Sequence, residues 1–335
     1  MNKIGIVGGA GFIGSALASY LSRSFRIKIL DIKLMLRDRE GSIEYEECDV
    51  RRYSDVKRGL KDVELVIHTA VVQIPLINEA KRLGYEVNIL GTQNVCEVVD
   101  RSPLIKGMIL AGSWHVVGER ELRGVIDEEF GFRPDKVEER ARLYALCKIG
   151  QEITLRVHDE MSKKIFGVIR MGTVLGKGMP KETAAAIFIR NGVEGKPLTP
   201  FKHSMYRPML YTDMNDVCKA FEAYATKILG GEIQKEGASL SHMVNVYWPE
   251  PITILELAET VRDAVVKHSR GKIRPEMEIV DKGQPVLFKP ENKDLMKVDV
   301  SKVKSFLGLK RLTDSKGTIE KLVKERLQEK RDSVC

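Results

Sequence analysis

The first 31 residues constrain the fold of this chain more than any other stretch, because apolar runs alternate there with a glycine-rich turn. Residues 3–7 (KIGIV) form a short apolar run that is typical of a buried strand. The turn GGAGFIG follows at once, and residues 15–25 then have the pattern of a helix. A second apolar run at 26–30 ends at Asp31. This order predicts the front half of a dinucleotide-binding βαβ unit.

Each part of this unit has a physical role in holding a dinucleotide. Gly8 permits a tight turn, Gly11 lets the backbone approach a pyrophosphate, and Gly14 lets the helix pack closely on the strand. The helix N-terminus offers free N–H groups and the positive end of its dipole to the phosphates. The pattern therefore predicts a bound dinucleotide.

Asp31 indicates which dinucleotide to expect. Its carboxylate can accept hydrogen bonds from both ribose hydroxyls, whereas the 2′-phosphate of NADP would meet a negative charge. Lys33 and Arg37 are near enough to oppose this preference, and we interpret them as solvated loop charges. The sequence predicts NAD as the cofactor.

The composition is that of a globular protein with a charged surface. The 335 residues are 43% hydrophobic and 30% charged, and no apolar run approaches the length of a membrane span. Much of the excess of basic residues that gives the net charge of +8 lies near the end of the chain. There, acidic residues alternate with basic ones, as on a solvated helix. The sequence contains no stripe of aromatic and basic residues of the kind that would indicate nucleic-acid binding. We expect a small-molecule substrate and neither a nucleic-acid nor a membrane partner.

Cysteine usage and the first residues indicate the compartment. The five cysteines are scattered, with neither a CxxC pair nor metal-ligand spacing, so we expect reduced thiols and no metal site. Residues 3–7 begin a strand immediately, which predicts that no signal peptide is present. These observations favour a cytoplasmic protein.

Strands and helices alternate through the first half of the chain, which predicts an α/β fold with a Rossmann-type doubly wound parallel sheet. Further strands are expected at 42–47, 64–69, 106–110 and 164–169. Helices are expected at 88–100, 138–160, 213–226 and 255–266, and short strands at 244–247 and 276–280. We expect an NAD-binding domain at residues 1–172. Residues 173–335 should mainly form a smaller substrate-binding lobe, with some segments returning to the main sheet.

Tyr144 and Lys148 are candidate catalytic residues, because a spacing of four places both on one face of a predicted helix. We expect the lysine ammonium to stabilise the phenolate and so to lower the pKa of the tyrosine. A phenolate can take a proton from a sugar or alcohol hydroxyl while a hydride leaves to a nicotinamide. Ser113 follows the strand expected at 106–110, at the carboxyl edge of the sheet, where its hydroxyl can steady charge on a substrate oxygen.

At this point the chain resembles the extended short-chain dehydrogenase/reductase superfamily, and within it the NAD-dependent epimerase/dehydratase family. The resemblance covers nearly the whole chain. The motifs that carry it follow in family order: GGAGFIG, Asp31, CDV with Asp49, HTAV from His68, NILGT from Asn88, AGSWHVVG with Ser113, YALCK, and VIRMGTVLG.

The resemblance implies a role for each matching position. Gly8, Gly11, Phe12 and Ile13 would contact the pyrophosphate, with Gly14 packing behind them. Asp31 would hold the adenosine ribose, Asp49 and Val50 would flank the adenine, and Ala70 and Val71 would line the nicotinamide side. Ser113, Tyr144 and Lys148 would be catalytic, and the last two would also border the cofactor. The helical segments 78–100 and 138–160 would pair with those of a second copy in a homodimer.

Departures from the family pattern bear on the reaction. Sugar-nucleotide 4,6-dehydratases carry an Asp-Glu pair where this chain has Trp114 and His115, which disfavours dehydration and also decarboxylation. Many 4-epimerases have an Asn at the position of Thr173, and that Asn touches the nucleotide-sugar phosphates. Arg207 lies in a segment similar to the phosphate-binding arginine region of the family. The motifs Ser-x-His-Val and Arg-x-Gly-Thr also resemble those of uronate dehydrogenases, which oxidise free sugar acids.

His115, Thr173 and Arg207 are therefore candidate substrate residues, although His115 could equally be a buried packing residue. The favoured hypothesis is an NAD-dependent 4-epimerase of a nucleotide sugar, which oxidises C4 transiently and returns the hydride. One alternative is a dehydrogenase of a free sugar, sugar acid or other hydroxy substrate that releases NADH. Another is a catalytically idle relative that senses NAD or binds RNA.

Overall fold

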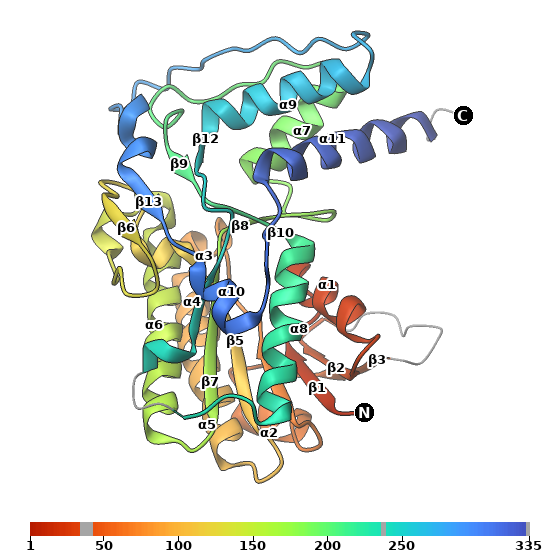
Figure 1. Cartoon of the computed structure of the whole chain (residues 1–335), viewed down its shortest axis with the longest axis vertical. Helices are drawn as coiled ribbons and strands as arrows, with labels where there is room; N and C mark the ends of the chain where they lie inside the picture. The colour runs from red at the N-terminus through yellow and green to blue at the C-terminus, as the bar shows by residue number, and fades with distance from the viewer. Residues whose placement is uncertain (34–42, 236–238, 333–335) are drawn as a thin grey trace.

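Seven parallel strands form the central sheet, and the predicted α/β fold with a doubly wound sheet is confirmed (Figure 1). The computed structural model describes residues 1–33, 43–235 and 239–332. The sheet has the strand order β11-β7-β5-β4-β1-β2-β3. These strands are β1 (Lys3–Val7), β2 (Arg26–Asp31), β3 (Ile43–Glu47), β4 (Leu65–His68), β5 (Gly107–Ser113), β7 (Ile165–Met171) and β11 (Met243–Val246). Because all of them run parallel, their carboxyl ends meet at one edge.

Helices cover both faces of this sheet. Successive side chains of a strand point to opposite faces, so Ile4 and Ile6 enter one apolar core while Val7 enters the other. The helices on the first face are α1 (Phe12–Leu21), α8 (Met214–Gly230) and α10 (Ser301–Leu307). Those on the second face are α2 (Tyr53–Gly59), α5 (Gly91–Arg101) and α6 (Glu139–Met161). The helices expected at 138–160 and 213–226 correspond to α6 and α8.

The connection from β4 to α5 is also helical but irregular. It consists of α3 (Leu76–Glu79), α4 (Lys81–Tyr85) and the π-helical turn η1 (Glu86–Leu90). The helix expected at 88–100 is therefore a π turn that leads into α5. Single π turns are rare and are often found at functional sites.

A third apolar core lies beyond the carboxyl edge of the sheet, among helices α7 (Ala184–Glu194), α9 (Ile254–His268) and α11 (Ser315–Asp332) (Figure 1). Thr253 and Glu256 form a capping box that starts α9. Three short strand pairs border this lobe. They are β8 (Thr173–Leu175) with β10 (Tyr211–Asp213), β9 (Pro208–Met209) with β12 (Ile252–Thr253), and β6 (Gly124–Ile126) with β13 (Met296–Val298).

The strand expected at 276–280 is wrong. This segment runs beside residues 198–202 but forms only the isolated bridges Leu198–Met277 and Phe201–Val280. Leu198 and Lys202 donate their backbone N–H groups across to it. Pro200, midway between these two donors, has no N–H to give, so a continuous ladder cannot form.

Three further properties of the described residues bear on the expectations from sequence. No helix in the ranges given above combines the length and the apolar composition needed to cross a membrane. Nor do those ranges contain three or more His, Cys, Asp or Glu side chains grouped to hold a metal ion. Cys48, Cys96, Cys147 and Cys218 are free and buried.

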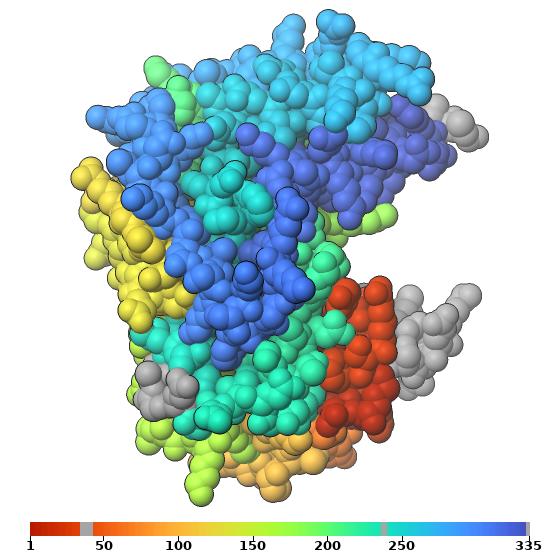
Figure 2. Space-filling view, in the orientation of Figure 1, coloured from red at the N-terminus to blue at the C-terminus, as the bar shows by residue number. Residues whose placement is uncertain are grey.

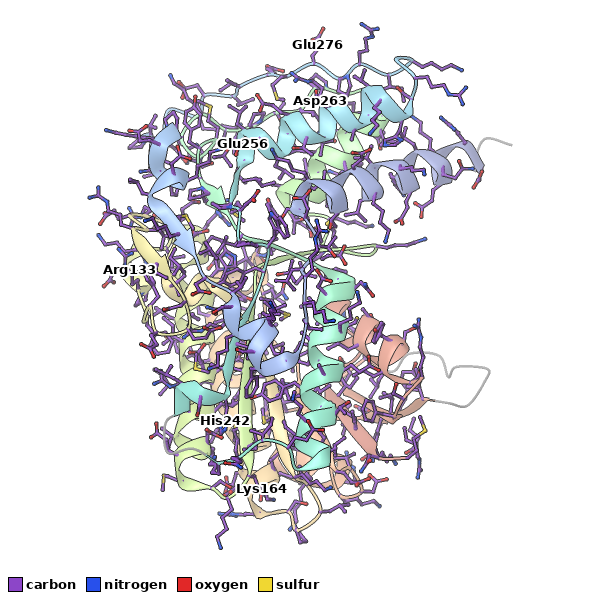
Figure 3. All side chains as sticks on the ribbon, viewed as in Figure 1. Arg133, Lys164, His242, Glu256, Asp263 and Glu276 are labelled. Carbon is purple, nitrogen blue, oxygen red and sulfur yellow. The ribbon has the colours of Figure 1, made fainter. Side chains whose placement is uncertain are left out.

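Asp159 joins three segments at the end of the sheet away from the α9 lobe, where Figure 3 labels His242 and Lys164. One carboxylate oxygen accepts hydrogen bonds from the Phe166 backbone N–H at 2.8 Å and from Lys235 Nζ at 2.7 Å. The other oxygen lies 2.7 Å from His242 Nδ1. Burial opposes ionisation of Asp159, but these three partners outweigh it and hold the pKa below its ordinary value.

We expect Asp159→Asn to lower the free energy of unfolding by about 3 kcal/mol, because it leaves Lys235 and His242 without their shared anion. The carboxylate contributes fully above its unfolded-state pKa of about 3.9. That contribution is lost as the pH falls through the lower folded-state pKa, so the deficit of the variant should narrow below about pH 4. Urea denaturation at several pH values measures this difference in the free energy of unfolding. Glu160→Gln, at the exposed neighbouring residue, is the control, and an equal loss in both variants would contradict the assignment.

Candidate functional site

The glycine-rich turn joins β1 to α1 and lies against the segment that follows β4. Gly8 has φ of 80°, a conformation that L side chains rarely adopt, and its N–H donates to the Leu30 carbonyl at 2.8 Å. A Cβ atom on Gly8 would lie 2.4 Å from the Ala70 backbone nitrogen. Only glycine therefore lets these two connections approach so closely.

The N-terminus of α1 is open to an anion. Gly11 caps the helix without a side-chain hydrogen bond, and no acidic residue occupies the first turn, which begins with Phe12 and Ile13. A Cβ atom on Gly14 would lie 2.4 Å from the Gly8 carbonyl oxygen, so the helix packs directly on the turn. The free N–H groups and the bare backbone fit a pyrophosphate. Figure 2 shows the surface hollowed between the red N-terminal segment that contains α1 and the dark blue α11.

Asp31 ends β2 beside this turn. One carboxylate oxygen accepts from the Ala10 backbone N–H at 3.0 Å, and the other accepts from the Lys33 backbone N–H at 3.0 Å. The carboxylate is thus oriented by the turn, and each oxygen keeps a second lone pair for another donor. Arg37 lies outside the described residues.

Asp49 and Val50 follow β3, as the resemblance implies, but Asp49 has a partner that the sequence does not predict. Arg51 holds it with a contact of 2.6 Å between Nη2 and Oδ2, and the hydrogen bonds from Arg51 lower the pKa of Asp49. Val50 packs against α5, where a Cβ atom on Gly91 would lie 2.6 Å from Val50 Cγ2. The Val50 carbonyl accepts from Asn94 Nδ2 at 2.9 Å.

Ala70 and Val71 lie in the connection after β4, and Asn88 fixes that connection. The Val72 N–H donates to Asn88 Oδ1 at 2.7 Å, and Asn88 Nδ2 donates to the Val72 carbonyl at 3.1 Å. Asn88 is fully buried and belongs to the π turn η1. The irregular turn therefore positions the backbone that faces Gly8.

The structure brings Ser113, Tyr144 and Lys148 together, as predicted. Ser113 is the last residue of β5, and the other two lie one turn apart on α6. Ser113 Oγ lies 3.1 Å from His115 Nδ1, and the His115 ring meets the Tyr144 ring edge to face with their centres 5.7 Å apart. Lys148 Nζ lies 5.9 Å from the centre of the Tyr144 ring and donates to the Ala111 carbonyl of β5 at 2.9 Å.

The expected effect of Lys148 on Tyr144 is wrong for this structure. Burial raises the pKa of Tyr144 to about 12, and the hydrogen bond to Ser113 offsets only part of that rise. Burial also lowers the pKa of Lys148 to about 8, because the ammonium is the charged form of a lysine. Desolvation acts on both groups and favours the neutral form of each.

A group of charged residues, three of them buried, lies beside this triad, and the sequence reasoning missed most of it. Arg207 Nη1 donates to Glu138 Oε1 at 2.7 Å, and Arg140 Nε donates to Glu138 Oε2 at 2.8 Å. Glu119 Oε1 is 3.7 Å from nitrogens of His115, Arg140 and Arg207. We call the buried Glu119, Glu138 and Arg207, together with the exposed Arg140, the charge cluster. In the sequence, the only indication of this cluster was the spacing of four residues between His115 and Glu119.

The three candidate substrate residues are placed differently. His115 and Arg207 both face Glu119, as these distances record. Arg207 is buried, and its Nε has no hydrogen-bond partner. Thr173 starts β8, where its N–H donates to the Leu210 carbonyl at 2.8 Å, and its side chain is half-buried.

Comparisons with known proteins agree with this geometry. The model of the NAD dependent epimerase/dehydratase family matches residues 4–235. A Methanocaldococcus jannaschii protein named "Putative UDP-glucose 4-epimerase" is 26% identical over 331 residues, which covers 95% of this chain and 96% of that protein. Two solved structures share the fold: MoeE5 in complex with UDP-glucuronic acid and NAD, and the UDP-glucose 4-epimerase of Thermus thermophilus in complex with NAD. MoeE5 has a TM-score of 0.76 at 18% identity, with 98% of this chain and 100% of that chain covered. The Thermus protein has a TM-score of 0.74 at 22% identity, with 97% and 99% covered.

Proposed function

The chain belongs to the NAD dependent epimerase/dehydratase family, and we propose that within it the protein is a nucleotide-sugar 4-epimerase. It is an NAD-dependent enzyme of the extended short-chain dehydrogenase/reductase type. The observation that carries the proposal is the meeting of Ser113, Tyr144 and Lys148 at the carboxyl edge of the sheet, beside the glycine-rich turn. The names of the relatives, which include UDP-glucose 4-epimerases, support a UDP-hexose substrate.

In the proposed reaction the residues of the chain handle the proton at C4 of the sugar. NAD, when bound, supplies the acceptor for the C4 hydride and later returns it. Tyr144 takes the proton of the C4 hydroxyl, and Ser113 hydrogen-bonds the same oxygen as charge develops on it. Turning of the keto sugar between the two hydride transfers inverts C4, so no NADH accumulates.

Cofactor binding is assigned to the open edge built from β1, β2 and the connection after β4. Gly8, Gly11, Phe12, Ile13 and Gly14 would cradle the pyrophosphate, which the uncapped start of α1 supports. Asp31 would hold the adenosine ribose, and Asp49 with Val50 would border the adenine. Ala70, Val71 and Lys148 would border the nicotinamide half.

A dehydrogenase of a free sugar or sugar acid is the second candidate, and Arg207 favours it. Arg207 Nη1 is already 2.7 Å from Glu138 Oε1, so the diphosphate of a nucleotide sugar has to compete with Glu138 for this guanidinium. A sugar acid needs no diphosphate contact. A catalytically idle NAD-sensing or RNA-binding relative is disfavoured, because it has no use for the assembled Ser113, Tyr144 and Lys148.

Incubation with NAD and UDP-glucose should give a mixture of C4 epimers, which chromatography separates. The absorbance of NADH at 340 nm should not rise. Tyr144→Phe should slow turnover about 10²–10⁴-fold, because it removes the proton-carrying hydroxyl. Tyr20→Phe, on α1, is the matched control and should keep the activity of the natural protein. Steady NADH release with a sugar acid, and no epimer, would move the assignment to the dehydrogenase.

Asp31 should make NAD bind about tenfold or more tightly than NADP, which is roughly 1.4 kcal/mol. Asp31→Ala should narrow this gap, because the 2′-phosphate then no longer meets a carboxylate. Calorimetric titration with both dinucleotides measures it. Asp263→Ala on α9, at a residue labelled in Figure 3, should leave the preference unchanged. Equal affinity of the unmodified protein for NAD and NADP would refute the role of Asp31.

A second copy of the chain is the proposed partner of one exposed apolar face. On α6, Leu146, Ile153 and Val157 are 43%, 45% and 47% exposed and lie on one side of the helix. Tyr85 and Leu90, on the adjoining α4 and η1, are 53% and 49% exposed. A continuous apolar face on neighbouring helices is typical of an interface. It coincides with the segments that the family resemblance assigns to a homodimer.

The unmodified protein should therefore have the mass of a dimer in light scattering at micromolar concentration. Ile153→Lys should shift it toward the monomer, because the charge would be buried in the interface. Ile279→Lys places the same charge at a similarly exposed isoleucine far from α6 and should leave the dimer intact. A monomeric unmodified protein would rule the interface out.

A further inference from the structure

Asp49 lies beside the residue that is expected to hold the adenosine ribose. β2 and β3 pair with Asp31 opposite Glu47, and the Cys48 backbone N–H donates to the Asp31 carbonyl at 3.0 Å. Asp49 is the next residue along the chain, just after the end of β3. A base attached to a ribose at Asp31 would therefore border Asp49, whose carboxylate is placed to read an edge of that base.

The carboxylate of Asp49 is already saturated with hydrogen bonds. A carboxylate has about four lone-pair sites, two on each oxygen. Asp49 Oδ1 accepts from the Arg51 backbone N–H at 3.0 Å and from Arg51 Nε at 2.9 Å. Asp49 Oδ2 accepts from the same Nε at 3.0 Å and from Arg51 Nη2 at 2.6 Å. One arginine thus takes the lone pairs of both oxygens and leaves none for a donor on a ligand.

Asp31 is in the opposite state. Its two oxygens accept one backbone N–H each, from Ala10 and from Lys33, both at 3.0 Å. Among the described residues no other donor reaches this carboxylate, so each oxygen keeps a lone pair, as the two hydroxyls of a ribose require. Of these two neighbouring carboxylates, the one beside the ribose can accept a new hydrogen bond and the one beside the base cannot.

A second carboxylate helps to hold Arg51 in this position. Arg51 Nη1 lies 3.5 Å from Glu86 Oε2, and the other oxygen of Glu86 accepts from Arg82 Nε at 2.7 Å. Glu86 starts the π turn η1, so the Arg51 guanidinium bridges the segment after β3 and this turn. The Asp49 side chain is 13% exposed, so water and salt screen its pair with Arg51 less than they screen a fully exposed pair.

The exocyclic amino group of adenine is the part of the base that an unpaired carboxylate would recognise. This group donates hydrogen bonds, and a bond from it to a charged acceptor is among the stronger ones. A purine without the amino group would leave such a carboxylate unpaired and would bind less tightly. Asp49 imposes no such requirement, because Arg51 occupies its lone pairs and balances its charge.

We propose that the cofactor site selects the ribose and not the amino group of the base, because Arg51 sequesters Asp49. Arg51 is thus the residue that sets the base specificity of the site. The ligands that the site takes are nicotinamide dinucleotides with a free ribose hydroxyl pair, whether or not the purine has an exocyclic amino group. The proposal rests on the proposed function, because it concerns the place where NAD would bind.

The test is calorimetric titration of the full chain with NAD and with nicotinamide purine dinucleotide, in which hydrogen replaces the exocyclic amino group. The unmodified protein should bind the two within about threefold of each other. Arg51→Ala frees the Asp49 carboxylate to accept from adenine, so this variant should bind NAD at least about tenfold more tightly than the purine dinucleotide.

Arg262→Ala is the matched control. The Arg262 side chain is 40% exposed, against 39% for Arg51, and it pairs with Asp263 on α9 at 3.0 Å. This variant removes an arginine of the same exposure from another carboxylate, so it should bind both dinucleotides as the unmodified protein does.

Two further variants identify the carboxylate as the source of any gain. Asp49→Ala alone should still bind the two dinucleotides within about threefold of each other, because Asp49 is not read when Arg51 holds it. Asp49→Ala combined with Arg51→Ala should lose the preference for NAD that Arg51→Ala gains, since the freed acceptor is then absent.

The outcomes separate this proposal from the proposed function. If both dinucleotides bind as expected but no nucleotide sugar is turned over, the reaction assignment fails while the specificity of the cofactor site stands. If neither dinucleotide binds, both proposals fall. If the unmodified protein already prefers NAD by about tenfold or more, the amino group is read with Arg51 in place and this proposal is overturned. It is also overturned if Arg51→Ala shows no preference, because Asp49 then does not face the base.

Discussion

The parallel pairing of β1, β4, β5 and β7 is the constraint on which the rest of the structure depends. It places Gly8, Ala70 and Ser113 at one edge, although more than a hundred residues of chain separate the first from the last. The close backbone approach at Gly8 then holds two of these carboxyl ends together. α6 brings Tyr144 and Lys148 to the same edge. Strand order therefore determines which residues meet at this edge, and their side chains then determine the chemistry.

Desolvation shapes the electrostatics of the site more than any single pair of charges. It holds the Tyr144 phenol and the Lys148 amine toward their neutral forms. In the charge cluster, two carboxylates and two guanidiniums face one another. His115 lies between the two groups, with Nδ1 3.1 Å from Ser113 Oγ and Nε2 3.7 Å from Glu119 Oε1.

Sequence patterns predicted the sheet, the glycine-rich turn and the meeting of Ser113, Tyr144 and Lys148, because each follows from local spacing and strand order. They did not predict what depends on packing. Glu138 and Arg140 come close to Arg207 only through the fold, and the pKa of Tyr144 follows from burial rather than from the spacing of Lys148. The segment 276–280 has a strand-like pattern, but its neighbour contains Pro200. A strand needs a partner that can donate.

The residues that follow Ser113 limit how parts of this protein can be exchanged with those of a relative. Trp114, Val116 and Val117 leave the sheet and are buried in the core of the α9 lobe. A chimaera that replaced only the C-terminal half with that of a relative would leave these side chains against a foreign core. The exchangeable unit is therefore discontinuous in sequence, and it includes the turn that carries His115. A new lobe and a new residue at the position of His115 would be inherited together.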